Sequence, residues 1–304
     1  MKPKHILITG GLGFIFSHAT EYFAAQGHKV TVIDNISAGS HPELEKKWEN
    51  MDITLLKADI NDIDDTWKIG RPPDIIIHAA AESDVDKSIH DPKAFLHSNV
   101  RGTLAMLEFA RKHKSKQFLY IGTDEMYGSS DKWCTPNDVL RPANPYSASK
   151  ASASHMCWAW ANTYGLPMQE VRMCNIIGRR QATTKLLPRL IDRIQNDEKM
   201  PIYDGGENTR EYMDVRDVSP LLERILTAGD AEIFNLTHNQ ELSIMDMLHA
   251  VENALDKKAK TVPATRPGHD ARYRMRAHNI THNEVGQRLS FHKLDDTIKW
   301  MLEN

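Results

Sequence analysis

Short aliphatic runs alternate with longer helix-like stretches through the first half of the chain, and this alternation restricts the possible folds most strongly. The runs lack the polar alternation of a strand with one face in water, so they are typical of strands buried on both faces. They are Ile6–Thr9, Val30–Ile33, Ile53–Leu56, Asp74–His78 and Phe118–Ile121. Between the last two, the spacing of apolar residues predicts one long helix over 92–113. Strands separated by helices indicate an α/β fold with a doubly wound parallel sheet and right-handed crossovers.

The second half begins with another long predicted helix, over 146–164, and then becomes less regular. After Pro188 shorter elements alternate with Gly and Pro turns, and a last helix is predicted over 294–302. We therefore expect two domains of unequal size. The larger covers 1–175, to which part of 210–240 returns, and the smaller, discontinuous one covers 176–304.

Composition and charge exclude several classes of protein. The 304 residues include 38 Lys and Arg against 41 Asp and Glu, a net charge of −3, which argues against nucleic acid as a partner. A hydrophobic fraction of 40% with a mean hydropathy of −0.51 is typical of a globular chain. No apolar run approaches the ~18 residues of a membrane span. The three cysteines form no CxxC pair, so we expect a reduced, cytoplasmic protein without a cysteine-based zinc site.

A glycine-rich turn lies between the first predicted strand and the helix that follows it. Gly10 and Gly13 allow the backbone to approach a pyrophosphate, which the amino end of a helix opening at Phe14 then stabilises. The second strand ends at Asp34, whose carboxylate can accept both ribose hydroxyls of NAD and repels a 2′-phosphate. Because no arginine adjoins Asp34, the sequence favours NAD over NADP and a Rossmann-type domain.

Tyr146 and Lys150 form a second candidate motif at the start of the helix over 146–164. Residues four apart share a helix face, so the Lys150 ammonium can lie beside the Tyr146 phenol and lower its pKa. A tyrosine with a lowered pKa can act as a base on a sugar hydroxyl during hydride transfer. Alone, this spacing is close to a chance match; it gains weight from a polar triplet that precedes it.

That triplet, Thr123-Asp124-Glu125, follows the predicted strand over 118–121. In a doubly wound sheet the ligand crevice lies at the carboxyl ends of the strands, which is where these residues fall. Two adjacent carboxyl groups can divide the work of acid and base if their surroundings separate their pKa values. A helix cap or a solvated turn uses the same residue types, so both interpretations stay open on the residues alone.

Taken in order, these motifs resemble the extended short-chain dehydrogenase/reductase family of nucleotide-sugar enzymes. Within it, the chain is most similar to the 4,6-dehydratases that act on dTDP-glucose. The likeness spans nearly the whole chain, in the stretches His78–Ser88, Thr123–Gly128, Asn144–Ala151, Pro201–Tyr203 and Arg266–Tyr273. The Asp124–Glu125 pair is the most specific element, since related epimerases and decarboxylases usually lack it.

The resemblance implies a reaction without net redox change on a nucleotide-diphosphate hexose, with NAD as the cofactor. Tyr146 would remove the 4-hydroxyl proton as a hydride leaves C4, while Lys150 holds Tyr146 and the nicotinamide ribose. Glu125 would then remove the C5 proton, Asp124 would protonate the departing 6-hydroxyl, and Thr123 would hydrogen-bond the 4-oxygen. Return of the hydride to C6 would give a 4-keto-6-deoxy sugar.

The resemblance also implies residues for binding and a homodimer formed by pairing the two long helices into a four-helix bundle. Beside Tyr146 and Lys150, the cofactor would contact Gly10, Gly13, Phe14, Ile15, Asp34, Asn35, Asp59, Ile60, Ala79, Ala80, Ala81 and Asn99. The nucleotide sugar, whose diphosphate needs fixed donors, would contact Ser83, Asn175, Lys185, Arg210, Asn239 and His269.

Three features depart from the family pattern. The third glycine of the dinucleotide turn is Phe16, so a phenyl ring must displace the helix or swing aside. Gly122 replaces the serine usual before Thr123. The third departure leaves the nucleotide base and the sugar open, because it changes positions near the sugar and phosphates, namely Ile176, Arg179, Arg180 and Thr184.

Two other functions stay open beside the dehydratase. A nucleotide-sugar 4-epimerase or decarboxylase on the same scaffold would use Tyr146 and Lys150 only. An NAD-binding or redox-sensing relative that has lost turnover would account for Phe16 and the altered segment. No metal is expected, because His278 and His282 have the spacing of a helical pair but no HExxH motif or third ligand accompanies them.

Overall fold

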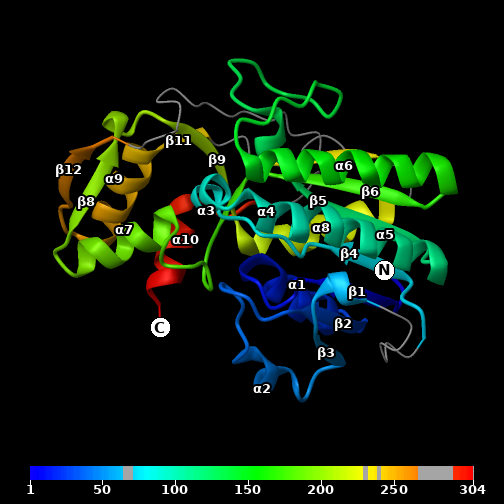
Figure 1. The fold of residues 1–304 in the computed structure, drawn as a ribbon. Coiled ribbons are helices and arrows are strands. Elements are labelled where there is room, and N and C mark those ends of the chain that lie inside the picture. Colours follow the sequence, from blue (N-terminus) through cyan, green and yellow to red (C-terminus); the bar gives the residue numbers. More distant parts are fainter. Residues whose placement is uncertain (64–70, 229–231, 238–240, 266–289, 304) are drawn as a thin grey trace.

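Seven parallel strands form the central sheet of the larger part of the molecule (Figure 1). The structure is a computed structural model, and it describes residues 1–63, 71–228, 232–237, 241–265 and 290–303. The strand order β10-β6-β5-β4-β1-β2-β3 confirms the predicted doubly wound, Rossmann-type α/β fold. The strands are β1 (His5–Thr9), β2 (Lys29–Asp34), β3 (Ile53–Lys57), β4 (Ile75–His78), β5 (Gln117–Thr123), β6 (Met168–Met173) and β10 (Ile233–Leu236).

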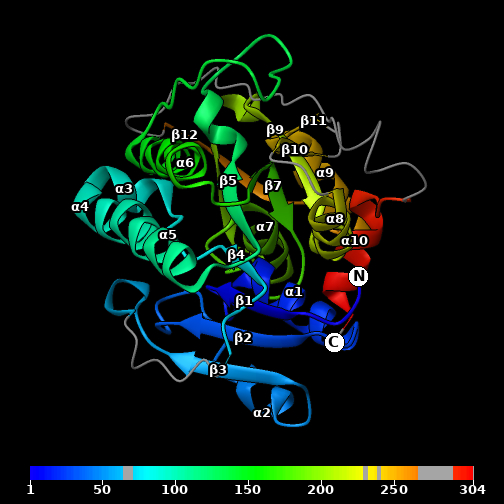
Figure 2. The same ribbon diagram turned by 90° about the vertical axis from the view of Figure 1, so that its right-hand side faces the viewer.

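The strands are buried on both faces because successive aliphatic side chains point into two different cores. Ile6 and Ile8 of β1 lie in one core and Leu7 in the other, as the alternation of a strand requires. The first core is closed by α1 (Phe14–Ala25) and α8 (Val215–Ala228), and the second by α5 (Gly102–His113) and α6 (Pro145–Tyr164). Figure 2 shows α5 and α6 on one side of the sheet and α8 on the other.

The helix predicted over 92–113 is continuous but not uniformly α-helical. It consists of α4 (Pro92–Phe95), a π-helical stretch over Leu96–Arg101, and α5. Within the π-helical stretch Asn99 points inward and is 1% exposed. Periodicity could not show this, because one wider turn barely changes the spacing of apolar residues. The helix predicted over 146–164 is confirmed as α6.

The smaller part contains a three-stranded sheet, β11-β9-β7, and a two-stranded sheet, β12-β8. Three helices pack on these strands around a third core. The C-terminal helix predicted over 294–302 is confirmed, and the division of the chain into two domains stays a prediction. The elements are β7 (Asn175–Ile177), α7 (Leu186–Gln195), β8 (Lys199–Tyr203), β9 (Thr209–Asp214), β11 (Glu241–Ser243), α9 (Ile244–Leu255), β12 (Lys260–Ala264) and α10 (Leu294–Leu302).

Short helical segments connect these elements. They are α2 (Leu44–Trp48), α3 (Val85–His90) and the 3₁₀ turns Ile60–Asp62, Asp124–Tyr127 and Asp204–Gly206. Within the described ranges, none of the helices combines the length and the apolar character that crossing a bilayer would take.

Candidate active site

The candidate catalytic residues meet at the carboxyl end of β5. Thr123 is the last residue of β5, and Asp124 and Glu125 open the 3₁₀ turn over residues 124–127, called the 124–127 turn below. Tyr146 lies in the first turn of α6 and shares a hydrogen bond with Thr123. Lys150 follows one turn later on the same face of α6. The structure therefore brings the triplet and the Tyr–Lys pair together.

The amino end of α6 also contacts the 124–127 turn through its cap. Asn144 caps the helix, since its side-chain oxygen accepts the Ser147 N–H at 2.9 Å. The Nδ2 atom of Asn144 lies 3.5 Å from Oε2 of Glu125. Pro145 occupies the first helical position, where a missing N–H costs nothing. These local signals fix where α6 begins, and therefore where Tyr146 lies relative to Glu125.

Asp124 and Glu125 occupy different environments. Asp124 is 1% exposed, whereas Glu125 is half-buried. The Thr123 hydroxyl donates to Oδ1 of Asp124 at 3.4 Å, and Oδ2 has no hydrogen-bond partner among the described residues. Burial, followed by the charges of Glu125 and Glu211, raises the pKa of Asp124 well above its usual value. This shift favours the protonated form of Asp124, which a general acid requires, beside a carboxyl that water can reach.

The electrostatic setting of Tyr146 differs from the prediction. Burial, followed by the charge of Glu125, raises the pKa of the phenol well above its ordinary value, so Lys150 does not lower it in this structure. Lys150 instead places Nζ 4.5 Å from the centre of the Tyr120 ring, and burial lowers its pKa to about 8. The helical spacing correctly placed Lys150 on the same face of α6 as Tyr146. The pKa of the Tyr146 phenol, however, is determined by burial and by the charge of Glu125 in the 124–127 turn.

The glycine turn has the backbone that a dinucleotide requires. Gly10 has φ +70°, and a Cβ atom there would lie 2.9 Å from Cα of Ala80, just beyond β4. Among the described residues, α1 opens without a side-chain cap, so its first N–H groups stay available to an anion. Gly13 precedes the helix, and the predicted contacts Phe14 and Ile15 are half-buried in its first turn.

Asp34 ends β2 beside this turn, as predicted. Its Oδ2 accepts the Leu12 N–H at 3.0 Å, and its Oδ1 accepts bonds from the Ile36 N–H and the Ser40 hydroxyl, both at 2.8 Å. These three bonds hold the carboxylate against the glycine turn and leave lone-pair capacity for a ribose hydroxyl. The residues present therefore fit the adenosine side of NAD.

Phe16, which replaces the third glycine, lies in the core between α1 and the sheet and is 6% exposed. Close packing of the turn on β2 occurs at Gly11 instead, where a Cβ atom would lie 2.8 Å from the Val32 side chain. The phenyl ring has therefore swung aside into the core, and the turn keeps its glycine backbone.

The other predicted cofactor residues line the same end of the sheet. Residues Ala79–Ala81 follow β4, and the first two donate their N–H groups to Thr9 Oγ1 at 3.0 Å each. Asn35 follows β2, and its Nδ2 donates to Asp59 Oδ2 at 3.3 Å; Ile60 is the next residue after Asp59.

Asn99 lies behind this site and supports it. Its Nδ2 donates to the Glu82 carbonyl and to Ser149 Oγ, both at 2.9 Å, and its Oδ1 accepts the Glu82 N–H at 2.8 Å. Ser149 donates in turn to the Tyr146 carbonyl at 2.7 Å. Both amide hydrogens are used within the protein. Asn99 therefore ties the loop after β4 to the helix that carries Tyr146 rather than donating to the cofactor.

The predicted substrate residues come from three separate segments. Lys185 Nζ lies 4.0 Å from Oδ2 of Asp84, the residue after Ser83. Asn175 opens β7 and Arg210 lies in β9, which are neighbouring strands of the three-stranded sheet. Two further predicted residues lie outside the described residues: Asn239 and His269.

Sequence reasoning missed Glu211, a carboxyl that is 1% exposed in β9. Its Oε1 accepts the Thr237 hydroxyl at 2.7 Å. The charge of Glu211 raises the pKa of Asp124 and that of Arg210 lowers it, so both residues act on the candidate acid. The available signal was its place beside Arg210, but a charged residue in a short strand ordinarily faces solvent.

The altered segment after β7 does not offer its two arginines to a sugar. Arg180 donates to both carboxylate oxygens of Glu21 at 3.0 Å and to Ser17 Oγ at 3.1 Å, both in α1. Arg179 donates to the Trp300 carbonyl at 2.7 Å and stacks on that ring, with Cζ 4.9 Å from its centre. The expectation that these residues stand near the phosphates is corrected: they join the segment to α1 and α10.

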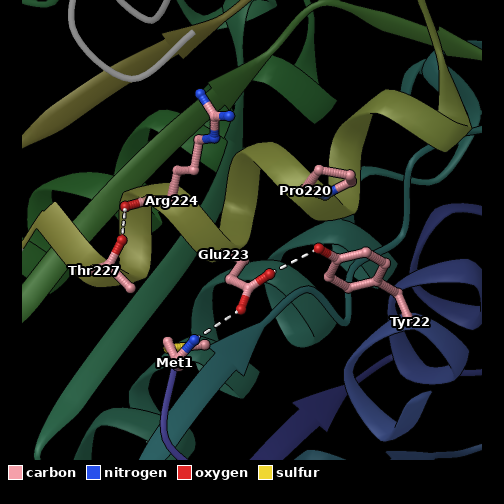
Figure 3. Close-up of a pocket in the computed structure, with 6 residues that line it drawn as sticks. All are labelled: Met1, Tyr22, Pro220, Glu223, Arg224 and Thr227. Atoms are coloured by element: carbon pink, nitrogen blue, oxygen red, sulfur yellow. Dashed lines mark hydrogen bonds and ion pairs between the residues drawn. The ribbon is translucent and has the colours of Figure 1, made fainter. Parts of the chain in front are cut away.

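An open pocket lies at the opposite, amino end of the strands (Figure 3). Within it Glu223 accepts the Met1 ammonium at 3.0 Å and the Tyr22 hydroxyl at 2.7 Å. The lining residues belong to the N-terminal segment, α1 and α8, and none is a candidate catalytic residue: Met1, Tyr22, Pro220, Glu223, Arg224 and Thr227.

The sequence model of the NAD dependent epimerase/dehydratase family matches residues 6–237. The chain belongs to this family. It is 35% identical over 274 residues to the low-salt glycan biosynthesis protein Agl12 of Haloferax volcanii, and the match covers 88% of each chain. It is 33% identical to the dTDP-glucose 4,6-dehydratase of Salmonella typhimurium, with 98% of this chain and 93% of that protein covered.

A crystal structure of DesIV, a dTDP-glucose 4,6-dehydratase of Streptomyces venezuelae with NAD and TYD bound, has the same fold. The TM-score is 0.91 at 29% identity, over 99% of this chain and 97% of that chain. NAD is the cofactor by which the family is described, so the predicted cofactor and the predicted resemblance are confirmed at the level of the family.

Proposed function

We propose that this chain is an NAD-dependent NDP-hexose 4,6-dehydratase, a lyase that forms an NDP-4-keto-6-deoxyhexose and water. The observation that carries the proposal is the adjacent carboxyl pair in two environments: Asp124, whose pKa is raised by burial, and half-buried Glu125. An epimerase needs a base at the 4-hydroxyl but no acid for a departing 6-hydroxyl, so it has no use for this pair. The relatives named dTDP-glucose 4,6-dehydratase support the same assignment.

The first stage is oxidation at C4. Bound NAD supplies the acceptor for the C4 hydride and the donor for its return at C6. The Tyr146 oxygen takes the 4-hydroxyl proton, and Thr123, which shares a hydrogen bond with Tyr146, holds the 4-oxygen. Lys150 lies one turn along α6, where its ammonium favours the ionised phenol once a sugar and cofactor fill the site.

The second stage removes water. The 4-ketone acidifies the C5 proton, and Glu125 removes it as a carboxylate. Asp124 donates its proton to the departing 6-hydroxyl, so the C6–O bond breaks and water leaves. The hydride lost from C4 then enters at C6 while a proton enters at C5, which gives the 4-keto-6-deoxy sugar.

The nucleotide diphosphate is proposed to bind between the loop after β4 and the smaller part of the molecule. Lys185 lies 4.0 Å from Asp84, the residue after Ser83, and Lys185 and Arg210 can supply charge-assisted hydrogen bonds to phosphate. Asn175 at the start of β7 adds an amide on the same side. A homodimer through α5 and α6 is part of the proposal.

The test is incubation of the purified protein with NAD and a panel of dTDP-, UDP-, CDP- and GDP-hexoses in deuterated water, followed by mass spectrometry. Loss of one water and gain of one deuterium at C5 would support the dehydratase and identify its substrate. An isomeric product of unchanged mass would indicate an epimerase. Silence across the panel, with NAD shown to be bound, would reject the dehydratase for those sugars.

A further inference from the structure

A buried ion pair lies behind the 124–127 turn, and the proposed mechanism does not use it. Glu170 and Arg172 stand two residues apart on β6, with side chains 0% and 4% exposed. The Nε of Arg172 donates to Oε1 of Glu170 at 2.8 Å. Burying two charges costs desolvation energy that an apolar pair would not, so stability alone does not account for these residues.

The Glu170 end of the pair is attached to α6. Ser154 Oγ and Trp158 Nε1 both donate to Oε2 of Glu170, each at 2.7 Å. Ser154 and Trp158 are four residues apart, so they share the face of α6 that packs on the sheet. This is the helix whose first two turns carry Tyr146 and Lys150. Glu170 therefore holds the helix that carries the proposed base.

The Arg172 end of the pair is attached to the 124–127 turn. Its Nη1 donates to the Tyr127 hydroxyl at 2.7 Å, and its Cζ lies 5.0 Å from the centre of the Tyr127 ring. The Tyr127 hydroxyl donates in turn to Oδ1 of Asn235 in β10 at 2.8 Å. Tyr127 is the last residue of the turn that opens with Asp124, so the turn is held from β6 and from β10.

Gly122, which stands where the family has serine, lies between the 124–127 turn and the Arg172 side chain. A Cβ atom at position 122 would lie 2.9 Å from Cε of Met126 and 3.5 Å from Cγ of Arg172. A side chain there would push the flexible end of Met126 aside within the turn, whereas its distance from Arg172 is that of an ordinary van der Waals contact. Position 122 therefore borders both the 124–127 turn and the ion pair on β6.

We propose that Glu170, Arg172 and Tyr127 are positioning residues that set the 124–127 turn against α6. Their network fixes Asp124 and Glu125 relative to the sugar that Tyr146 oxidises. The catalytic meaning of this inference rests on the proposed function. Loss of the Tyr127 end of the network should affect elimination more than oxidation, because Tyr127 holds the turn that carries Asp124 and Glu125, whereas Tyr146 lies on α6, which the Glu170 end holds.

Tyr127→Phe tests the inference, because it removes the hydroxyl and keeps the ring. Its kcat should fall about 10- to 100-fold with a smaller change in KM, as expected when reacting groups are misplaced by a fraction of an ångström. Oxidation should then outrun elimination, so the absorbance of reduced nicotinamide should accumulate in the steady state. Tyr22→Phe is the control, since it removes a tyrosine hydroxyl that makes an equally short hydrogen bond, to the Glu223 carboxylate, at the other end of the sheet (Figure 3).

Hydrogen exchange supplies a readout that needs no turnover. The amides of residues 123–128 should exchange faster in Tyr127→Phe and in Glu170→Gln than in the wild type or in Tyr22→Phe. Unchanged kcat and exchange in Tyr127→Phe would overturn the inference, and so would faster exchange throughout the chain or an equal loss of both stages. If the wild type converts no sugar, the proposed function fails, and exchange alone decides the positioning role.

Discussion

Single residues at the strand ends show how hydrogen bonds fix protonation states near the site, and His78 at the end of β4 is the clearest case. Its Nδ1 lies 2.9 Å from Thr9 Oγ1, and its Nε2 lies 2.9 Å from Thr103 Oγ1. Thr9 Oγ1 already accepts two backbone N–H groups, so its own proton goes to Nδ1 and the ring proton sits on Nε2. Burial lowers the pKa of His78 to about 3, so the ring is neutral.

This protonation state predicts an acid dependence of stability. Between pH 6.5 and about 3 the unfolded chain binds a proton at His78 that the folded chain does not. The free energy of unfolding should therefore fall with decreasing pH, by ~1.4 kcal/mol per pH unit from this group. His78→Asn should be less stable near neutrality but lack this part of the slope. Urea denaturation between about pH 7 and 5 measures it, and equal slopes in both proteins would contradict the prediction.

Asp124→Asn tests the proposed acid directly. The amide keeps the shape of the side chain but cannot protonate the departing 6-hydroxyl, so dehydration should slow by about 10²- to 10⁴-fold. Oxidation at C4 should persist, which reduced-nicotinamide absorbance would show. Asp138→Asn, an exposed aspartate in the following loop, is the control and should retain wild-type turnover. Wild-type dehydration by Asp124→Asn would rule out this role.

Gly128, which follows the 124–127 turn, should tolerate no side chain. Its φ of +76° and ψ of −167° favour glycine, and a Cβ atom there would lie 2.1 Å from the Arg141 carbonyl oxygen. Gly128→Ala should lower the free energy of unfolding by about 1–3 kcal/mol from backbone strain, and further from the clash. Gly165→Ala, at the end of α6 with open space around it, should cost only about 1 kcal/mol. Equal losses in urea denaturation would contradict this account.

At the scale of elements, the sequence predicted the helices whose signals are local. The bounds of α6 and α10 follow from apolar spacing and end residues, and the structure reproduces them almost to the residue. The π-helical stretch within 92–113 could not be predicted in this way. It is held by bonds from Asn99 to Glu82 and Ser149, which lie in other segments of the chain.

The same distinction applies to the candidate site. Ligands bind at the carboxyl ends of parallel strands, and this rule was enough to predict that Gly10, Asp34 and Thr123 lie at the same end of the sheet. The raised pKa of Tyr146 was beyond the sequence, because it depends on how deeply α6 packs and how close the 124–127 turn comes. The burial of Glu211 is a tertiary property of the same kind.

Arg180, in the segment that follows β7, is bound to Glu21 of α1, and this contact gives a prediction at the scale of elements. Arg180→Gln breaks the paired bonds to Glu21, while Lys47→Gln removes another partner of the same carboxylate, at 2.8 Å, without touching the segment. Arg180→Gln should lose about 1.5–3 kcal/mol of stability and raise the KM for the nucleotide sugar severalfold, because the segment leads from Asn175 to Lys185. Lys47→Gln should leave that KM unchanged. Identical KM values for Arg180→Gln and the wild type would argue against the link.

At the scale of the whole molecule, the outward faces of α5 and α6 should form the interface of a homodimer. Leu104 is 37% exposed on α5, and Ser152, His155 and Ala159 form an exposed strip along α6. Ser152 and Ala159 are small, which allows a second helix to approach α6 closely. Ala159→Arg should therefore yield a monomer by light scattering after gel filtration, whereas Asn50→Arg, on an exposed turn after α2, should not. A monomeric wild type would refute the prediction.

The return of the chain to β10 has a consequence for how the protein is made. Asn235 in β10 accepts the hydroxyl of Tyr127, a residue 108 positions earlier, and β10 closes the edge of the sheet beside β6. Synthesis runs from the amino end, so a ribosome has released every candidate catalytic residue long before it releases β10. The nascent protein would therefore carry its complete set of catalytic groups for a time without the strand that secures them.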